Sequence, residues 1–148
     1  MNRGIDSSSA DGAEPGKPLF VHRSTVWFDE LDMVGVLHNA RYAIHVERAM
    51  AVWFHSMPDV DPSDAHTVVK NYEIEFISPF TRERGDLVVE IGCARVGNTS
   101  ATYTFRCLSE GENGEEIVHA RGNRTNVKVS RDDLRPTPWS DSFRALFA

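Results

Sequence analysis

Cysteine is scarce in this 148-residue sequence, and its scarcity excludes several classes of protein. The two cysteines, Cys93 and Cys107, are too few for a disulfide framework and lack the spacing of metal ligands. A single disulfide between neighbouring strands is one alternative. We expect reduced thiols instead, because an unpaired cysteine commonly behaves as a small buried apolar residue.

Long apolar runs and an excess of basic charge are also absent. Charged residues interrupt every apolar stretch, so we expect no membrane-spanning segment. The formal net charge is −6 with acids and bases well mixed, which argues against a nucleic-acid partner. Hydrophobic residues make up 41% of the chain and charged residues 26%, as is usual for a globular domain.

The first eighteen residues differ in composition from the rest. They are rich in Ser, Gly, Asp and Pro and contain few large apolar side chains. Such a segment buries too little surface to offset its ordering entropy, so we expect a disordered tail at 1–18 and one domain at 19–148. The tail has no apolar central region, which favours a cytoplasmic protein over a secreted one.

Familiar catalytic motifs are missing as well. The sequence has no Gly-x-Ser-x-Gly elbow, no glycine-rich phosphate loop after a strand and no His-Glu-x-x-His zinc motif. We therefore expect neither a bound metal nor a cofactor.

The hydrophobic periodicity predicts one long helix. Apolar residues recur at helical spacing from Ala40 to about Met57, with Asn39 as the expected N-cap. We expect His45 and His55, on the polar side of this helix, to be solvated. The apolar face comprises Tyr42, Val46, Ala49, Met50, Trp53 and Met57.

Strands are expected on both sides of this helix. Residues 19–28 form a first strand, and alternation with a period of two begins at residue 67 and is broken at Pro79. Further strands follow at 87–96, 101–108 and 117–129, with turns at 97–98 and 113–114 and a short helix at 139–147. The order predicts an α+β fold in which one curved antiparallel sheet of five strands wraps the long helix.

Asp32 is the candidate catalytic residue. It lies in an acidic loop at 29–35, directly before the helix, where unpaired backbone N–H groups from Leu37 to Asn39 could hold an oxyanion. Gly35 allows the backbone to approach a ligand closely. The alternative is that the acidic loop only complements the helix dipole, which contributes about 0.3–1 kcal/mol without catalysis.

A family resemblance favours the catalytic interpretation. The run from Val26 to Tyr42, with Asp32-Met33-Val34-Gly35 at its centre and Glu47-Arg48-Ala49 after it, resembles the 4-hydroxybenzoyl-CoA thioesterase family of hotdog-fold proteins. The resemblance extends over residues 20–138. It implies a hotdog fold and an acyl-CoA thioesterase that uses Asp32 as general base or nucleophile, acting on an acyl-CoA or acyl-carrier-protein thioester.

The resemblance also implies other site residues and an assembly. Active sites of the family lie at the interface of a homodimer, and dimers often form tetramers. Glu47 is a second catalytic candidate, although an ion pair with an arginine would equally explain a charge on an otherwise apolar helix row. The candidate oxyanion and substrate-binding residues are Gly35, Leu37, His38, Asn39 and Tyr42, and those for the phosphates of coenzyme A are Arg82, Arg84, Lys128, Arg131 and Arg135.

Departures from the family pattern narrow the mechanism. Many members have His in place of Asn39, and Val34 and Val36 replace the Asn and His that plant acyl-carrier-protein thioesterases require. Two alternatives stay open. One is an enoyl-thioester hydratase, which usually needs His where Leu37 stands, and the other is a non-catalytic acyl-CoA-binding or regulatory module.

Overall fold

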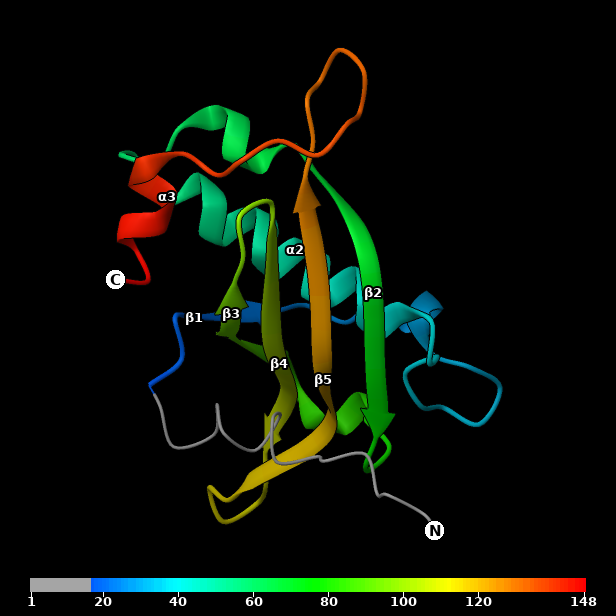
Figure 1. Ribbon diagram of the computed structural model, residues 1–148. Coiled ribbons are helices and arrows are strands. Elements are labelled where there is room, and N and C mark those ends of the chain that lie inside the picture. The colour runs from blue at the N-terminus through cyan, green and yellow to red at the C-terminus, as the bar shows by residue number, and fades with distance from the viewer. Residues whose placement is uncertain (1–16) are drawn as a thin grey trace, which may run out of the picture.

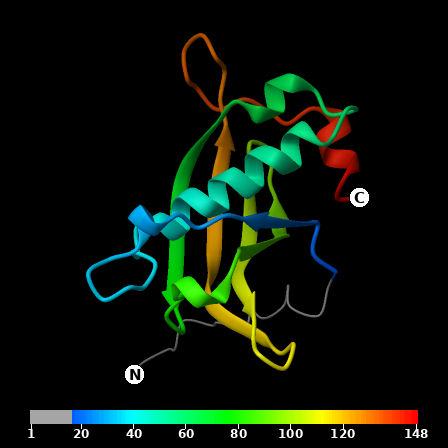
Figure 2. The same ribbon diagram turned by 180° about the vertical axis from the view of Figure 1, so that it is seen from behind.

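The computed structural model describes residues 17–148, which fold around one long helix, α2 (Arg41–His55). Five antiparallel strands wrap this helix in the order β1-β3-β4-β5-β2 (Figures 1 and 2). The strands are β1 (Phe20–Ser24), β2 (Thr67–Phe76), β3 (Leu87–Val96), β4 (Ser100–Glu110) and β5 (Glu116–Lys128). The described residues also form three short 3₁₀-helices, η1 (Phe28–Glu30), η2 (Pro62–Ala65) and η3 (Arg82–Arg84), and a terminal helix α3 (Asp141–Ala145).

The element order confirms the predicted α+β fold. Strand β3 has the predicted bounds, and β4 and β5 differ from prediction by one or two residues at their ends. The first strand is shorter than predicted, because it ends at Ser24 and the chain turns into η1 at Phe28. The predicted tail at 1–18 falls, apart from its last two residues, outside the described part of the chain.

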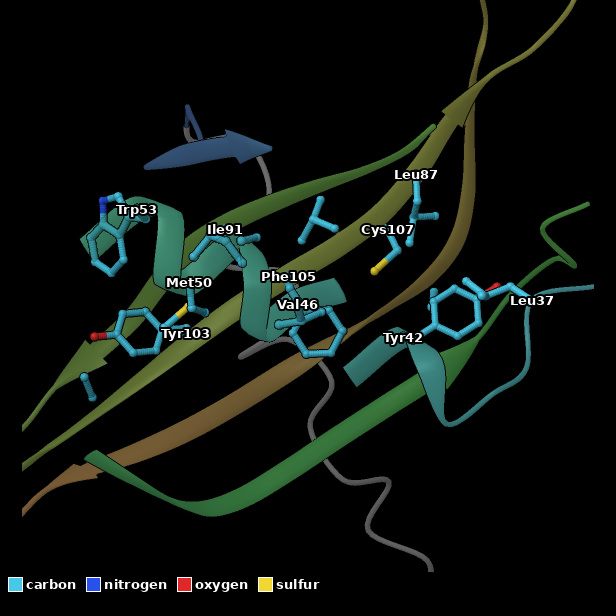
Figure 3. Packing of buried hydrophobic residues seen from close by; sticks show 14 of the residues in the cluster. Leu37, Tyr42, Val46, Met50, Trp53, Leu87, Ile91, Tyr103, Phe105 and Cys107 are labelled. Atoms are coloured by element: carbon cyan, nitrogen blue, oxygen red, sulfur yellow. The ribbon is translucent and has the colours of Figure 1, made fainter. Parts of the chain in front are cut away.

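The core lies between α2 and the concave face of the sheet. The helix buries its predicted apolar face, with Val46 and Ala49 at most 1% exposed. In Figure 3, Leu37 and Tyr42 lie at one end of this core and Trp53 and Tyr103 at the other. Burying each large apolar side chain stabilises the fold by about 1.5–3 kcal/mol, so this face holds the helix in place.

Two local predictions for this helix were wrong. Asn39 is not the N-cap: Ala40 occupies that position without a side-chain cap, and its N–H donates to His38 Nδ1 at 3.1 Å. His45 is not solvated but fully buried, because Glu30 and Ser24 supply hydrogen-bond partners for both ring nitrogens.

The two cysteines agree with the expectation of unpaired thiols. Cys93 and Cys107 are both free, and Cys107 is buried. Within residues 17–148, no helix has the length and apolar character needed to cross a membrane.

Candidate active site

A cleft of about 420 Å³ lies between the loop before α2 and the end of β2. Five of the sequence-predicted site residues line it: Asp32, Leu37, His38, Asn39 and Tyr42. The opposite wall is the segment 76–79, which runs from the last residue of β2 to Pro79. Sequence analysis predicted neither this wall nor Val36 as part of the site. The only sequence feature that marks the wall is the end of a strand before Pro79.

The segment from Glu30 to His38 forms a small hairpin, which we call the Asp32 hairpin. Leu31 and Leu37 pair as an antiparallel bridge, and the His38 N–H donates to the Glu30 carbonyl at 3.0 Å. At the tip, the Gly35 N–H donates to the Asp32 carbonyl at 3.0 Å. Gly35 has φ +80°, a conformation that glycine adopts at little steric cost, so it closes the turn that presents Asp32.

The Asp32 carboxylate is held by one oxygen only. Its Oδ1 accepts the N–H groups of Val34 at 2.9 Å and Val36 at 3.2 Å. In the described part of the chain, Oδ2 accepts no hydrogen bond. The carboxylate is therefore fixed in orientation and keeps one oxygen for a ligand or a water molecule.

The backbone N–H groups near the cleft are not equivalent. Those of Leu37 and His38 donate to the carbonyls of Phe80 at 2.9 Å and Glu30 at 3.0 Å. The Ala40 N–H donates to His38 Nδ1. Among residues 37–40 of the described chain, only the Asn39 N–H has no acceptor. Of the three N–H groups predicted to hold an oxyanion, those of Leu37 and His38 are thus bonded within the protein, and that of Asn39 is left for a ligand.

Two aromatic side chains line the cleft, Tyr42 from α2 and Phe76 from the end of β2. The rings of Tyr42 and Phe76 lie 5.5 Å apart at an interplanar angle of 59°. Burial is the main cause that raises the pKa of Tyr42 to about 12, so the phenol keeps its proton at neutral pH. The cleft thus combines aromatic rings with a neutral phenol hydroxyl.

His119 holds the opposite wall of the cleft through a hydrogen bond to Ser78. Its ring is fully buried, and Nδ1 donates to the Ser78 carbonyl at 3.1 Å while Nε2 lies 2.6 Å from Ser109 Oγ. Burial is the main cause that lowers the pKa of His119, and the nearby Arg84 lowers it further. The neutral ring therefore fixes the segment that contains Ser78.

Glu47 does not line this cleft. Its side chain is 68% exposed, and its Oε1 accepts a hydrogen bond from Arg124 Nη2 at 3.3 Å. The geometry within one chain agrees with the ion-pair alternative. A catalytic role for Glu47 would require a cleft formed with a second copy of the chain.

The five cationic residues predicted to bind phosphates do not converge. Arg82 and Arg84 are exposed in η3, next to Thr81, whose backbone bridges to Val36 of the Asp32 hairpin. Arg131 and Arg135 are exposed in the loop beyond β5, at the opposite end of the sheet (Figure 1). Lys128 is buried and bonds Asp64 at 2.9 Å, so the geometry disagrees with a phosphate-binding role.

The sequence model of the thioesterase superfamily matches residues 34–115, which is more than half of the chain. The chain belongs to the thioesterase superfamily. The predicted family is thus confirmed, and with it the assignment as a thioester hydrolase at the level of the family. No curated protein is significantly similar to the chain in sequence.

Solved structures of thioesterases confirm the hotdog fold. A thioesterase superfamily protein from Jannaschia sp. superposes with a TM-score of 0.76 at 22% identity, covering 95% of this chain and 87% of that chain. A Thermus thermophilus thioesterase in complex with coenzyme A and zinc gives a TM-score of 0.72 at 23% identity, covering 86% and 90%. A 4-hydroxybenzoyl-CoA thioesterase variant with an Asp-to-Asn substitution, in complex with 4-hydroxybenzoyl-CoA, gives 0.74 at 14% identity, covering 86% and 97%. Within residues 17–148 of the present chain, no three His, Cys, Asp or Glu side chains are grouped as metal ligands.

Proposed function

We propose that this protein is an acyl-CoA thioesterase in which the Asp32 carboxylate drives hydrolysis and the Asn39 N–H polarises the thioester carbonyl. One observation carries the proposal. Asp32, which has one carboxylate oxygen without a hydrogen bond, and Asn39, whose N–H has no acceptor in the described chain, line the same cleft, which can receive a thioester carbonyl. Membership of the thioesterase superfamily and the coenzyme A complexes of similar structures support it.

Two routes to hydrolysis start from this arrangement. Acting as a general base, Asp32 takes a proton from water, and the resulting hydroxide attacks the thioester carbon. Acting as a nucleophile, Asp32 attacks that carbon itself, and water then cleaves the mixed anhydride. In both routes the carbonyl oxygen gains negative charge that the Asn39 N–H stabilises, and the carbon–sulfur bond breaks to release coenzyme A as a thiolate.

The thioester substrate makes a strong general acid unnecessary. A thiol has a pKa of about 8.5, so the thiolate leaves without a proton donor near neutral pH. This agrees with a cleft in which Asp32 is the acid–base group and Tyr42 is a phenol with a raised pKa. The proposal therefore needs only the groups that border the cleft.

The test is the substitution Asp32→Asn, which keeps the shape of the side chain and removes its basicity. Acyl-CoAs of varied chain length and aromaticity are supplied, and released thiol is measured. We expect kcat to fall by about 10³-fold or more, as for loss of a principal catalytic group. Asp29→Asn is the matched control, since Asp29 is exposed, lies three residues away and does not line the cleft. Wild-type hydrolysis by the Asp32 variant would refute the proposal.

The protein's own thiols interfere little with this assay. Burial raises the pKa of Cys107 to about 12 and also raises the pKa of Cys93. Thiol reagents act on thiolates, so the signal comes from coenzyme A. Calorimetric binding of acyl-CoA without thiol release by the wild-type protein would favour the alternative, a non-catalytic binding module.

We also propose that the protein is a homodimer or a homotetramer. Strand β2 is a ten-residue edge strand whose Val68 and Val69 are nearly half exposed. A long edge strand with apolar side chains is normally covered by another chain. Light scattering of the purified protein tests this, and a monomer at micromolar concentration would contradict it.

A further inference from the structure

Three buried polar side chains from three separate elements form a chain of hydrogen bonds beside α2. Ser24 ends β1, Glu30 ends η1 and His45 lies in the second turn of α2, and they are 3%, 4% and 0% exposed. Glu30 Oε1 lies 2.8 Å from His45 Nε2, and Ser24 Oγ lies 2.5 Å from His45 Nδ1. Every polar atom of the imidazole therefore has a partner.

The proton positions in this network follow from the partners. An ionised Glu30 only accepts hydrogen bonds, so His45 Nε2 carries the hydrogen. Burial, the largest cause, lowers the pKa of His45, so the ring is neutral near pH 7 and its Nδ1 accepts. The Ser24 hydroxyl then donates to Nδ1. With Glu30 ionised and the ring neutral, this assignment satisfies all three side chains.

The residue types are those of a catalytic triad, but the location excludes that role. None of the three side chains lines the cleft, and the Ser24 hydroxyl is buried at the end of β1. A nucleophile must reach the acyl carbon, and a buried hydroxyl that does not line the cleft cannot do so. The network must act through other residues or have only a structural role.

Glu30 connects the network to the catalytic residues. Its Oε2 accepts the Trp27 N–H at 2.8 Å, which fixes the start of η1. Its carbonyl accepts the His38 N–H at 3.0 Å, which closes the base of the Asp32 hairpin. Asp32 follows Glu30 by two residues, and Asn39 follows His38 directly. The position of Glu30 therefore influences the positions of both the Asp32 carboxylate and the Asn39 N–H.

We propose that His45 is a positioning residue for thioester hydrolysis: through Glu30 it fixes the base of the Asp32 hairpin and thereby aligns Asp32 with the Asn39 N–H. The role rests on the proposed function, because it acts on groups that the mechanism uses. A displacement of about 1 Å at such groups can lower the rate about 100-fold. Nothing in the network touches the cleft, so substrate binding depends on it far less than the chemical step does.

The test compares two substitutions at one position. His45→Phe keeps the ring and removes both hydrogen bonds, and we expect kcat to fall about 100-fold with KM unchanged. His45→Gln supplies an amide N–H for Glu30 and is expected to retain most of the wild-type kcat. A folded His45→Phe variant with wild-type kcat would overturn the proposal, as would a fall in kcat that His45→Gln shares fully. If His45→Phe does not fold, the double variant Glu30→Gln/His45→Phe removes the buried charge and is expected to show the same loss.

A matched pair of serine variants separates positioning from stability. Ser24 donates within this network, and Ser140 donates to buried Asp64 at 2.5 Å in a separate network near α3. Ser24→Ala should lower kcat, whereas Ser140→Ala should lower the melting temperature without changing kcat. Equal kcat for both variants would contradict the positioning role. If Asp32→Asn is inactive, such a result overturns this role alone, while an active Asp32→Asn variant overturns the proposed function itself.

Discussion

Asp32 and Val36 form two hydrogen bonds with each other. The Asp32 N–H donates to the Val36 carbonyl at 2.8 Å, and the Val36 N–H donates to Asp32 Oδ1 at 3.2 Å. This reciprocal pair closes a turn whose other constraint is the positive φ of Gly35. The orientation of the Asp32 carboxylate therefore depends on the backbone of its own loop.

The first prediction concerns Gly35→Ala. An added Cβ meets no atom within 4 Å, so its cost arises from the left-handed backbone alone, about 1–2 kcal/mol. We expect this loss of stability and, because the turn presents Asp32, a lower kcat. Gly114→Ala is the control, because Gly114 has φ +78° in the turn between β4 and β5 and does not line the cleft. Urea denaturation and thiol release should show similar destabilisation for both variants, with kcat lowered only by Gly35→Ala.

The second prediction concerns recognition of coenzyme A. Arg82 and Arg84 are exposed beside the Asp32 hairpin, whereas Arg131 and Arg135 lie at the other end of the sheet. Loss of one charge-assisted hydrogen bond costs about 1.5–3 kcal/mol, so we expect Arg82→Ala/Arg84→Ala to raise KM at least tenfold with kcat retained.

Arg131→Ala/Arg135→Ala serves as the matched comparison. It leaves KM unchanged if each cleft uses arginines of its own chain only. A rise in KM for this variant instead would indicate that the second pair reaches the cleft of a partner subunit.

The third prediction is a pH dependence of stability. Burial lowers the pKa of both His45 and His119 from the ordinary value of 6.5. Below pH 6.5 the unfolded chain therefore binds more protons than the folded chain, and the free energy of unfolding falls as the pH is lowered toward the folded-state pKa values. Each histidine contributes a slope of at most about 1.4 kcal/mol per pH unit, and above pH 6.5 the contribution is fully present.

Urea denaturation between about pH 5 and pH 7 measures this slope, with His119→Asn as the variant that removes one titrating group. We expect a smaller difference in unfolding free energy between the two ends of the range than in the wild type. An unchanged difference would mean that His119 does not titrate with a lowered pKa.

The fourth prediction concerns Lys128, whose ion pair with Asp64 is buried on both sides, at 7% and 0% side-chain exposure. Lys128→Met leaves a buried carboxylate without its cation, and we expect a loss of about 3–5 kcal/mol in the free energy of unfolding. Arg121→Met breaks a surface pair with Glu75 and should cost no more than about 1 kcal/mol. KM for acyl-CoA should not change in the folded Lys128 variant, and a selective rise in KM would restore this residue to the phosphate-binding set.

The secondary structure could be predicted because its signals are local. Alternation with a period of two marked β2, turn signals separated β3, β4 and β5, and the helical repeat from Tyr42 to Trp53 marked α2. The predictions failed at some ends of elements, where one side-chain hydrogen bond decides between competing residues. Asn39 has the residue type of an N-cap, but the His38 ring takes the Ala40 N–H, so Asn39 is not used in that way.

The sequence by itself determined the family, the fold and the acidic loop that contains Asp32. Only the tertiary structure decided which backbone N–H groups are available to a ligand, because the acceptors that occupy Leu37 and His38 are the carbonyls of Phe80 and Glu30. It also decided that His45 and Lys128 are buried, since each meets a carboxylate contributed by another element, Glu30 and Asp64. The sequence shows which side chains are polar or charged, whereas the fold decides which partner permits the burial of each.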